Sequence, residues 1–178
     1  MTLAALQHII RAAQALAEDR DILVLGSASL LASFPQLGNA DSPLAATYGS
    51  DLCPDPFDEL TGTMLDEALG ENRAYYLRHG YHADILRDTI LETLPAGWRE
   101  RLVSVPGCTA AHALEPHDLA VVKLLVVRPK DISLLVHLHS AGLIEAEVVR
   151  ARLDFLDIPV ELVPRLHSNF RNVFGGGK

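Results

Sequence analysis

The stretch Asp21-Ile-Leu-Val-Leu-Gly-Ser-Ala-Ser-Leu-Leu, residues 21–31, decides the fold that the sequence predicts. Its residues 22–25 form a short apolar run, which is typical of a buried strand. Gly26 and Ser27 end this run, and residues 28–32 have the pattern of a helix start with Ser27 as its N-cap. Free backbone N–H groups at a helix start can hold a phosphate, and a glycine lets a ligand approach the backbone closely. An ordinary strand-to-helix turn is the alternative interpretation.

Two later stretches add candidate chemistry. Residues 46–53 predict a second strand, which Pro54 ends or marks as a sheet edge. The two-residue period of a strand places Gly49, Asp51 and Cys53 on one face. Residues 115–131 read Glu-Pro-His-Asp-Leu-Ala-Val-Val-Lys-Leu-Leu-Val-Val-Arg-Pro-Lys-Asp, an apolar helix pattern interrupted by Lys123.

In this order, the three stretches resemble the bacterial nucleotidyltransferase-fold superfamily. The likeness is closest to its uncharacterised branch near the minimal nucleotidyltransferases and the abortive-infection nucleotidyltransferase toxins. The resemblance covers most of residues 20–145 and implies an α/β (α+β) fold with a mixed sheet and flanking helices. It also implies an NTP ligand with Mg²⁺, the phosphates lying at Gly26 and Ser27.

The resemblance implies that Asp51 is the catalytic, metal-binding acid. The family places an acid-x-acid pair on this strand, and the first acid is replaced here by Gly49, which has no side chain to bind a metal. Asp55 is a further metal candidate, but it lies beyond Pro54 and has to turn back to help. A solvated acid in a loop is the alternative interpretation of Asp51.

Basic residues of the third stretch match the family as well. By this resemblance Lys123 and Arg128 contact the nucleotide, and Asp118 and Asp131 support the site. From the residues alone, a buried lysine is costly unless it is paired. Lys123 therefore either extends its charge to the surface or forms an ion pair with Asp118 or Asp131.

Two weaker patterns lie between these stretches. Residues 81–86 predict a strand only weakly, because His82 and Asp84 interrupt its apolar residues. The chain has eight histidines, but no spacing among them is typical of a zinc site. We therefore interpret the histidines as surface or core side chains.

The composition limits the class of protein. Of 178 residues, 49% are hydrophobic and 21% are charged, which predicts a folded chain. A net charge of −8 disfavours coating of nucleic acid, so we expect nucleic acid only as an acceptor. No apolar run approaches the ~20 residues that span a membrane, and residues 1–17 lack a signal-peptide pattern. Reduced Cys53 and Cys108 are therefore expected in the cytoplasm, a disulfide between them being the alternative.

These patterns predict three regions: an α/β core in residues 1–114, a helical part packed on it in residues 115–174, and a disordered tail in residues 175–178. Two functions are compatible with them. One is a degenerate nucleotidyltransferase-like protein that binds a nucleotide or a protein partner, with a toxin–antitoxin or phage-defence role by analogy. The other is an active metal-dependent enzyme that transfers a nucleoside monophosphate from NTP to a protein or RNA hydroxyl.

Overall fold

Two compact units make up the chain in the computed structural model, which describes residues 1–18 and 20–175. The first unit contains residues 1–90 and 101–115, and the second contains residues 91–100 and the chain from residue 116 onward. The predicted α+β class with a mixed sheet is confirmed. Of the predicted tail, residues 176–178 lie outside the described residues.

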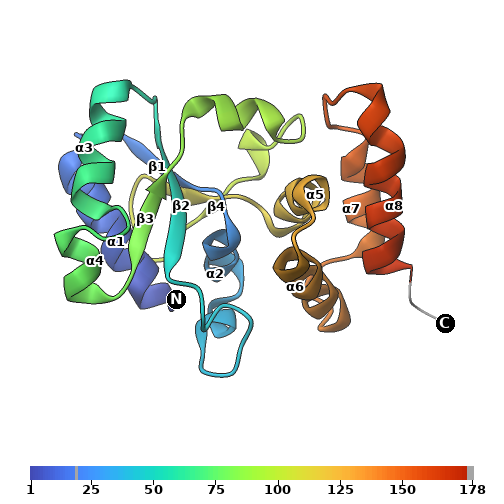
Figure 1. Cartoon of the computed structure of the whole chain (residues 1–178), viewed down its shortest axis with the longest axis horizontal. Coiled ribbons are helices and arrows are strands. Elements are labelled where there is room, and N and C mark those ends of the chain that lie inside the picture. Colours follow the sequence, from blue (N-terminus) through green and yellow to red (C-terminus); the bar gives the residue numbers. More distant parts are fainter. Residues whose placement is uncertain (19, 176–178) are drawn as a thin grey trace. The chain divides into compact units, whose positions relative to one another are not determined.

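A five-stranded sheet in the order β3-β2-β1-β5-β4 forms the first unit (Figure 1). The central strand β1 is antiparallel to β2 and parallel to β5, while β3 is parallel to β2 and β4 antiparallel to β5. The strands are β1 (Asp21–Val24), β2 (Gly49–Asp55), β3 (His82–Ile85), β4 (Val103–Ser104) and β5 (Ala111–Ala113). The buried strand predicted over residues 22–25 and the strand predicted over residues 46–53 are observed as the antiparallel neighbours β1 and β2.

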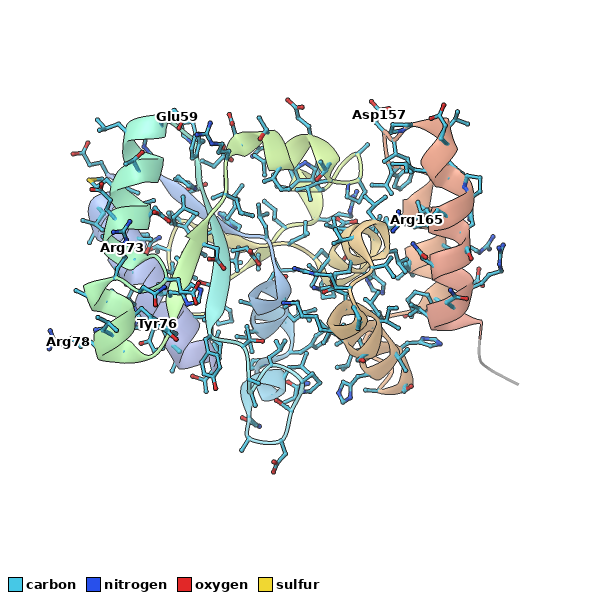
Figure 2. All side chains as sticks on the ribbon, in the orientation of Figure 1. Glu59, Arg73, Tyr76, Arg78, Asp157 and Arg165 are labelled. Atoms are coloured by element: carbon cyan, nitrogen blue, oxygen red, sulfur yellow. The ribbon has the colours of Figure 1, made fainter. Side chains whose placement is uncertain are left out.

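The helices α1, α3 and α4 lie together along one side of this sheet (Figure 1). Alternation along β2 explains the arrangement, because Ser50, Leu52 and Pro54 are buried on one face while Asp51 on the other face is half-buried. Charged side chains mark the outer faces of the helices, among them Glu59 and Arg73 (Figure 2). The helices of the unit are α1 (Leu3–Leu16), α2 (Leu30–Ser33), α3 (Glu59–Leu69) and α4 (Ala74–His79), with short 3-10 segments at Ser27–Ser29, Pro35–Gly38 and Asp88–Thr93.

A polar stripe on α1 fixes the β4–β5 connection. Gln7, Arg11 and Gln14 recur at helical spacing, so they share one face of α1. Gln7 Nε2 donates to the Pro106 carbonyl at 2.6 Å, Arg11 Nη2 donates to the Gly107 carbonyl at 3.0 Å, and Gln14 Nε2 donates to the Thr109 carbonyl. The stripe satisfies carbonyls of a turn that has no strand partner.

The predicted end of the second strand at Pro54 is wrong. Strand β2 continues through Pro54 to Asp55, because its pairing with β3 ends at Leu52 and no β3 residue needs an N–H from position 54. Residues 108–110 lie in the connection between β4 and β5. Cys53 and Cys108 are free thiols.

The second unit is helical. Leu119, Leu135, Leu138 and Val149 are buried in its core. Residues 91–100 join it through a hydrogen bond from Ala96 N to the Phe155 carbonyl at 2.8 Å. Its helices are α5 (Pro116–Val126), α6 (Pro129–Ser140), α7 (Ala146–Leu153) and α8 (Val163–Phe174), with 3-10 segments at Arg99–Arg101 and Val160–Leu162. Pro164 lies in the first turn of α8, where proline is tolerated.

No helix among the described residues is long and apolar enough to cross a membrane.

Candidate functional site

The turn after β1 and the strand β2 meet at Gly26 and Asp51, which the sequence assigned to one site. Leu25 N donates to the Asp51 carbonyl at 3.0 Å, so the ladder continues one residue past β1. A Cβ atom added at Gly26 would overlap Asp51 Oδ2 and Cγ. The carboxylate of Asp51 therefore occupies the space that a side chain at position 26 would fill. Only glycine allows this close approach.

The turn itself differs from the prediction. Gly26, not Ser27, holds the cap position of the 3-10 segment, and no side chain caps it. That segment and α2 are both short, so they supply a smaller helix dipole than the helix predicted over residues 28–32 implied. Ser27 is half-buried beside Gly26, and the Ser29 hydroxyl is buried without a hydrogen-bond partner among the described residues.

Strand β3 brings a second acid to this face. Asp51 and Asp84 are Cα partners in the parallel register of β2 and β3, so their side chains leave the same face of the sheet. The Asp84 side chain is 53% exposed. His82 and Asp84 weaken the strand prediction for residues 81–86, because they interrupt its apolar residues. Their two-residue spacing was the signal that they share a face.

Two side chains of β3 lie over Gly49, the position at which the resemblance predicts an acid. A Cβ atom added at Gly49 would lie 2.8 Å from Asp84 Oδ2 and 2.8 Å from His82 Nε2. Both side chains therefore lean from β3 over the glycine. His82 is 8% exposed, its Nε2 lies 3.5 Å from Asp84 Oδ1, and its Nδ1 is buried without a partner among the described residues.

Asp55 does not join this group. It lies four residues beyond Asp51 on a continuous strand, which separates the two Cα atoms by about 13 Å at the rise of a strand. The turn back that the metal role of Asp55 required is absent from β2. Among the described residues, no group of three or more His, Cys, Asp or Glu side chains is arranged to hold a metal ion.

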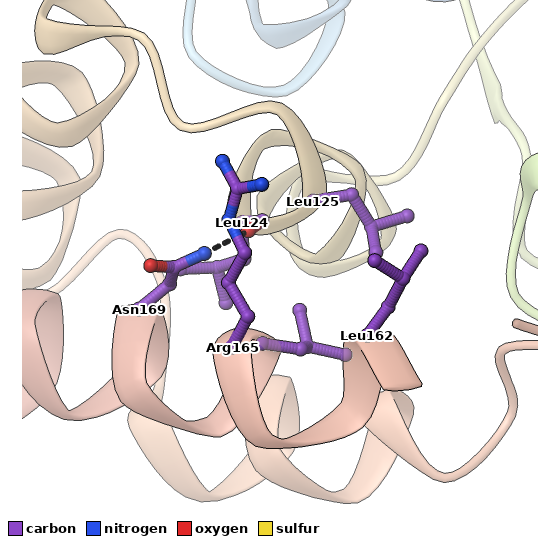
Figure 3. Close-up of a pocket in the computed structure, with 6 residues that line it drawn as sticks. Leu124, Leu125, Leu162, Arg165 and Asn169 are labelled. Atoms are coloured by element: carbon purple, nitrogen blue, oxygen red, sulfur yellow. Dashed lines mark hydrogen bonds between the residues drawn. The ribbon is translucent and has the colours of Figure 1, made fainter. Parts of the chain in front are cut away.

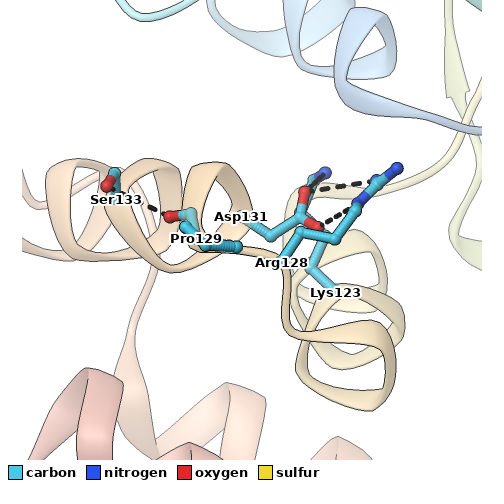
Figure 4. Close-up of polar contacts among 5 residues, drawn as sticks. All are labelled: Lys123, Arg128, Pro129, Asp131 and Ser133. Atoms are coloured by element: carbon cyan, nitrogen blue, oxygen red, sulfur yellow. Dashed lines mark hydrogen bonds and ion pairs between the residues drawn. The ribbon is translucent and has the colours of Figure 1, made fainter.

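Lys123, Arg128 and Asp131 form a compact ionic cluster in the second unit (Figure 4). Lys123 Nζ lies 2.6 Å from Asp131 Oδ1, and Arg128 Nε lies 2.7 Å from Asp131 Oδ2. Lys123 is 5% exposed and Asp131 is 1% exposed. The ion-pair alternative for Lys123, with Asp131 as its partner, is confirmed.

The two basic partners of Asp131 favour the ionised form of its carboxyl group. Burial raises the pKa of a carboxylate, but hydrogen bonds from Arg128 and Lys123 outweigh it, and the pKa of Asp131 is lowered from 3.8. The positive charges of Lys123 and Arg128 are correspondingly directed at this carboxylate. Asp118 is likewise buried and accepts from Arg152 Nη1 at 2.5 Å.

A small pocket in the second unit lies between α5 and α8 (Figure 3). Leu124, Leu125, Leu162 and Leu166 supply its apolar lining, and Asn169 Nδ2 donates to the Leu124 carbonyl at 2.9 Å. Its volume of about 30 Å³ holds one or two water molecules, so it is too small for a nucleotide.

Comparison of the chain with protein-family models, curated proteins and solved structures finds no match in any of the three.

Proposed function

We propose that the chain is a nucleotidyltransferase-like protein that binds a nucleotide through a divalent cation at Asp51, with weak or absent transfer. The observation that supports this proposal is the contact between Gly26 and the Asp51 carboxylate. Gly26 comes from the turn after β1 and Asp51 from β2, and the resemblance assigns one to the phosphates and the other to the metal. Their contact brings an acid directly beside the glycine turn.

The proposed binding mode follows from the ligands available. Mg²⁺ is commonly bound by one or two carboxylates together with substrate phosphates, and it keeps several waters. Asp51 would supply a carboxylate, and the Gly26–Ser27 turn would supply backbone N–H groups to the phosphates. Lys123 and Arg128 have no phosphate contact in this proposal, because both already neutralise Asp131.

We expect weak transfer of a nucleoside monophosphate, because β2 supplies only one carboxylate at the proposed site. A two-metal transfer reaction needs ions that bridge the attacking and leaving oxygens, and one acid restrains such a pair of ions poorly. Gly49 supplies no carboxylate at the position that the family uses.

An active transferase is the second candidate, and Asp84 favours it. This acid is the register partner of Asp51 on the neighbouring strand, and it leans over Gly49. Asp51 and Asp84 together would provide the two carboxylates that the reaction needs. In this candidate a hydroxyl of protein or RNA attacks the α-phosphorus of NTP, and pyrophosphate leaves.

Calorimetry of the full chain with each NTP, in Mg²⁺ or Mn²⁺, tests the proposal. We expect binding that requires the cation and falls at least about tenfold in Asp51→Ala. The matched control is Glu71→Ala, which removes an exposed acid from the same unit. If no NTP binds in either metal, the proposal fails.

Labelled NTP and cell extract then separate the two candidates. Labelling of a protein or RNA that disappears in both Asp51→Ala and Asp84→Asn would establish the active transferase. Binding without labelling supports the degenerate protein.

A further inference from the structure

An aromatic cluster joins α4 to α1 in the first unit. His8 of α1 stacks on Tyr75 with ring centroids 5.6 Å apart and meets His79 edge-on at 4.7 Å. Tyr75 and His79 belong to α4, and their ring centroids lie 4.6 Å apart. Tyr81, just before β3, lies 6.0 Å from His8 and 5.9 Å from Tyr75.

This cluster holds α4 to α1. No residue of α4 is fully buried, so the helix contributes little to the apolar core. The helix is also held by Tyr76, whose ring meets His82 of β3 edge-on with centroids 5.2 Å apart, and by an ion pair of Arg73 with Asp66 of α3 at 3.7 Å between exposed side chains. A pair of that kind stabilises a fold weakly. The aromatic rings therefore carry the attachment of α4 to α1.

The hydrogen bonds of the cluster depend on a neutral imidazole. His8 Nδ1 lies 2.6 Å from the Tyr81 hydroxyl and 2.9 Å from the Tyr75 hydroxyl. A neutral Nδ1 accepts a phenolic proton, whereas a protonated one can only donate. A proton on His8 Nδ1 would thus turn this atom from an acceptor into a donor toward the two tyrosine hydroxyls.

The surrounding groups make protonation of His79 unfavourable. The groups that face His79 are Tyr75 and Arg78 on its own helix, His8 on α1 and Tyr81 after the helix. Across the described residues, neither His8 nor His79 has an ion-pair partner among the carboxylates. Partial burial, the charge of His8 and the charge of Arg78 lower the pKa of His79 from 6.5.

We infer that α4 is an acid-released latch, held at neutral pH by the His8–Tyr75–His79–Tyr81 cluster and freed when His79 takes up a proton. The positive charges of His8 and Arg78 repel a protonated His79. A group with a lowered pKa in the docked state stabilises that state above its ordinary pKa, and this contribution disappears as the pH falls. The release therefore occurs below pH 6.5.

Amide exchange of the full chain at pH 7.5 and pH 5.0 tests the latch. Protection factors remove the intrinsic pH dependence of exchange, and the amides of Leu77 and Gly80 report on α4 because they donate within it. We expect their protection to fall by about tenfold at pH 5.0, which corresponds to about 1.4 kcal/mol. The amides of α8 should change less than twofold.

Variants separate the latch from general acid unfolding. His79→Gln keeps a polar side chain but cannot take up a proton, so the fall in protection should disappear. His8→Gln is the second variant, in case His79→Gln loosens α4 at both pH values. His167→Gln, exposed on α8, is the matched control and should retain the fall. Unchanged α4 protection at pH 5.0, or an equal fall in both cluster variants, would overturn the inference.

Discussion

The contact of Gly26 with Asp51 allows us to predict the effect of adding one methyl group at position 26. In Gly26→Ala the new Cβ atom overlaps the Asp51 carboxylate, so the acid must rotate away from the turn. We expect nucleotide affinity to fall at least about tenfold, which corresponds to about 1.4 kcal/mol, with the fold intact. Calorimetric titration measures the affinity, and circular dichroism checks the fold.

A control for this substitution is Ala45→Ser, which adds a side-chain atom at an exposed position before β2. Its affinity should equal that of the parent. Full affinity in Gly26→Ala would mean that the nucleotide does not depend on the position of Asp51.

The ion cluster of the second unit makes a prediction about stability. In Asp131→Asn, buried Lys123 loses its counter-ion, and breaking a buried pair from one side costs about 3 kcal/mol. Urea unfolding at pH 7 should show this loss in the free energy of unfolding. Glu147→Ala breaks an exposed pair with Arg150 and serves as the control with no measurable loss.

The same carboxylate gives a pH dependence with a definite sign. The pKa of Asp131 is lowered in the fold, so its contribution is complete above pH 3.8 and is lost as the pH falls below that value. We expect the difference in unfolding free energy between parent and Asp131→Asn to shrink below pH 3.8. A difference that persists at pH 2 would contradict this assignment.

At the scale of the element, the stripe on α1 is a tie between a helix and a turn. Gln7→Ala with Gln14→Ala removes two side-chain donors to carbonyls of the turn. Each such bond contributes about 1 kcal/mol, so we expect the unfolding free energy to fall by about 1–2 kcal/mol. Gln36→Ala, exposed in a 3-10 segment, is the control for loss of a glutamine.

The elements also explain how far the sequence could predict the fold. β1 could be predicted from its own residues, because an apolar run that ends at a glycine indicates a strand whatever its neighbours in the sheet are. Asp84 was missed, because its place beside Asp51 depends on the register of two strands that are far apart in sequence. Asp55 was assigned a possible turn back, but pairing with Asp21 on β1 keeps it in the strand.

Helix boundaries followed local signals more closely. The Asp58 side chain caps α3 by accepting from Thr61 N at 3.0 Å, and Gly80 ends α4 in the left-handed conformation. The predicted N-cap at Ser27 is wrong, because Gly26 holds the cap position and no side chain caps the segment.

At the scale of the whole molecule, each unit is built from two separate pieces of chain. The predicted boundary at residue 114 lies next to the observed change between residues 115 and 116. Residues 91–100, however, cluster with the later helices, and only tertiary contacts such as Ala96 with Phe155 reveal that membership. No local composition change marks this segment.

This division makes Trp98 a reporter for the second unit. It is the single tryptophan of the chain and is 8% exposed. In thermal unfolding, the fluorescence transition of Trp98 should move to lower temperature in Asp131→Asn. If the fluorescence transition keeps its temperature while circular dichroism shows unfolding at a lower temperature, Trp98 does not report on the unit that contains Asp131.

The strand order has a consequence for synthesis on the ribosome. β1 lies between β2 and β5, yet β2 emerges soon after it and β5 only when residue 113 has been made. Through the intervening translation, one edge of Ile22–Val24 has no neighbour, and such an edge can pair with other chains. Chains released after residue 100 should therefore aggregate or recruit a chaperone, and chains released after residue 115 should not.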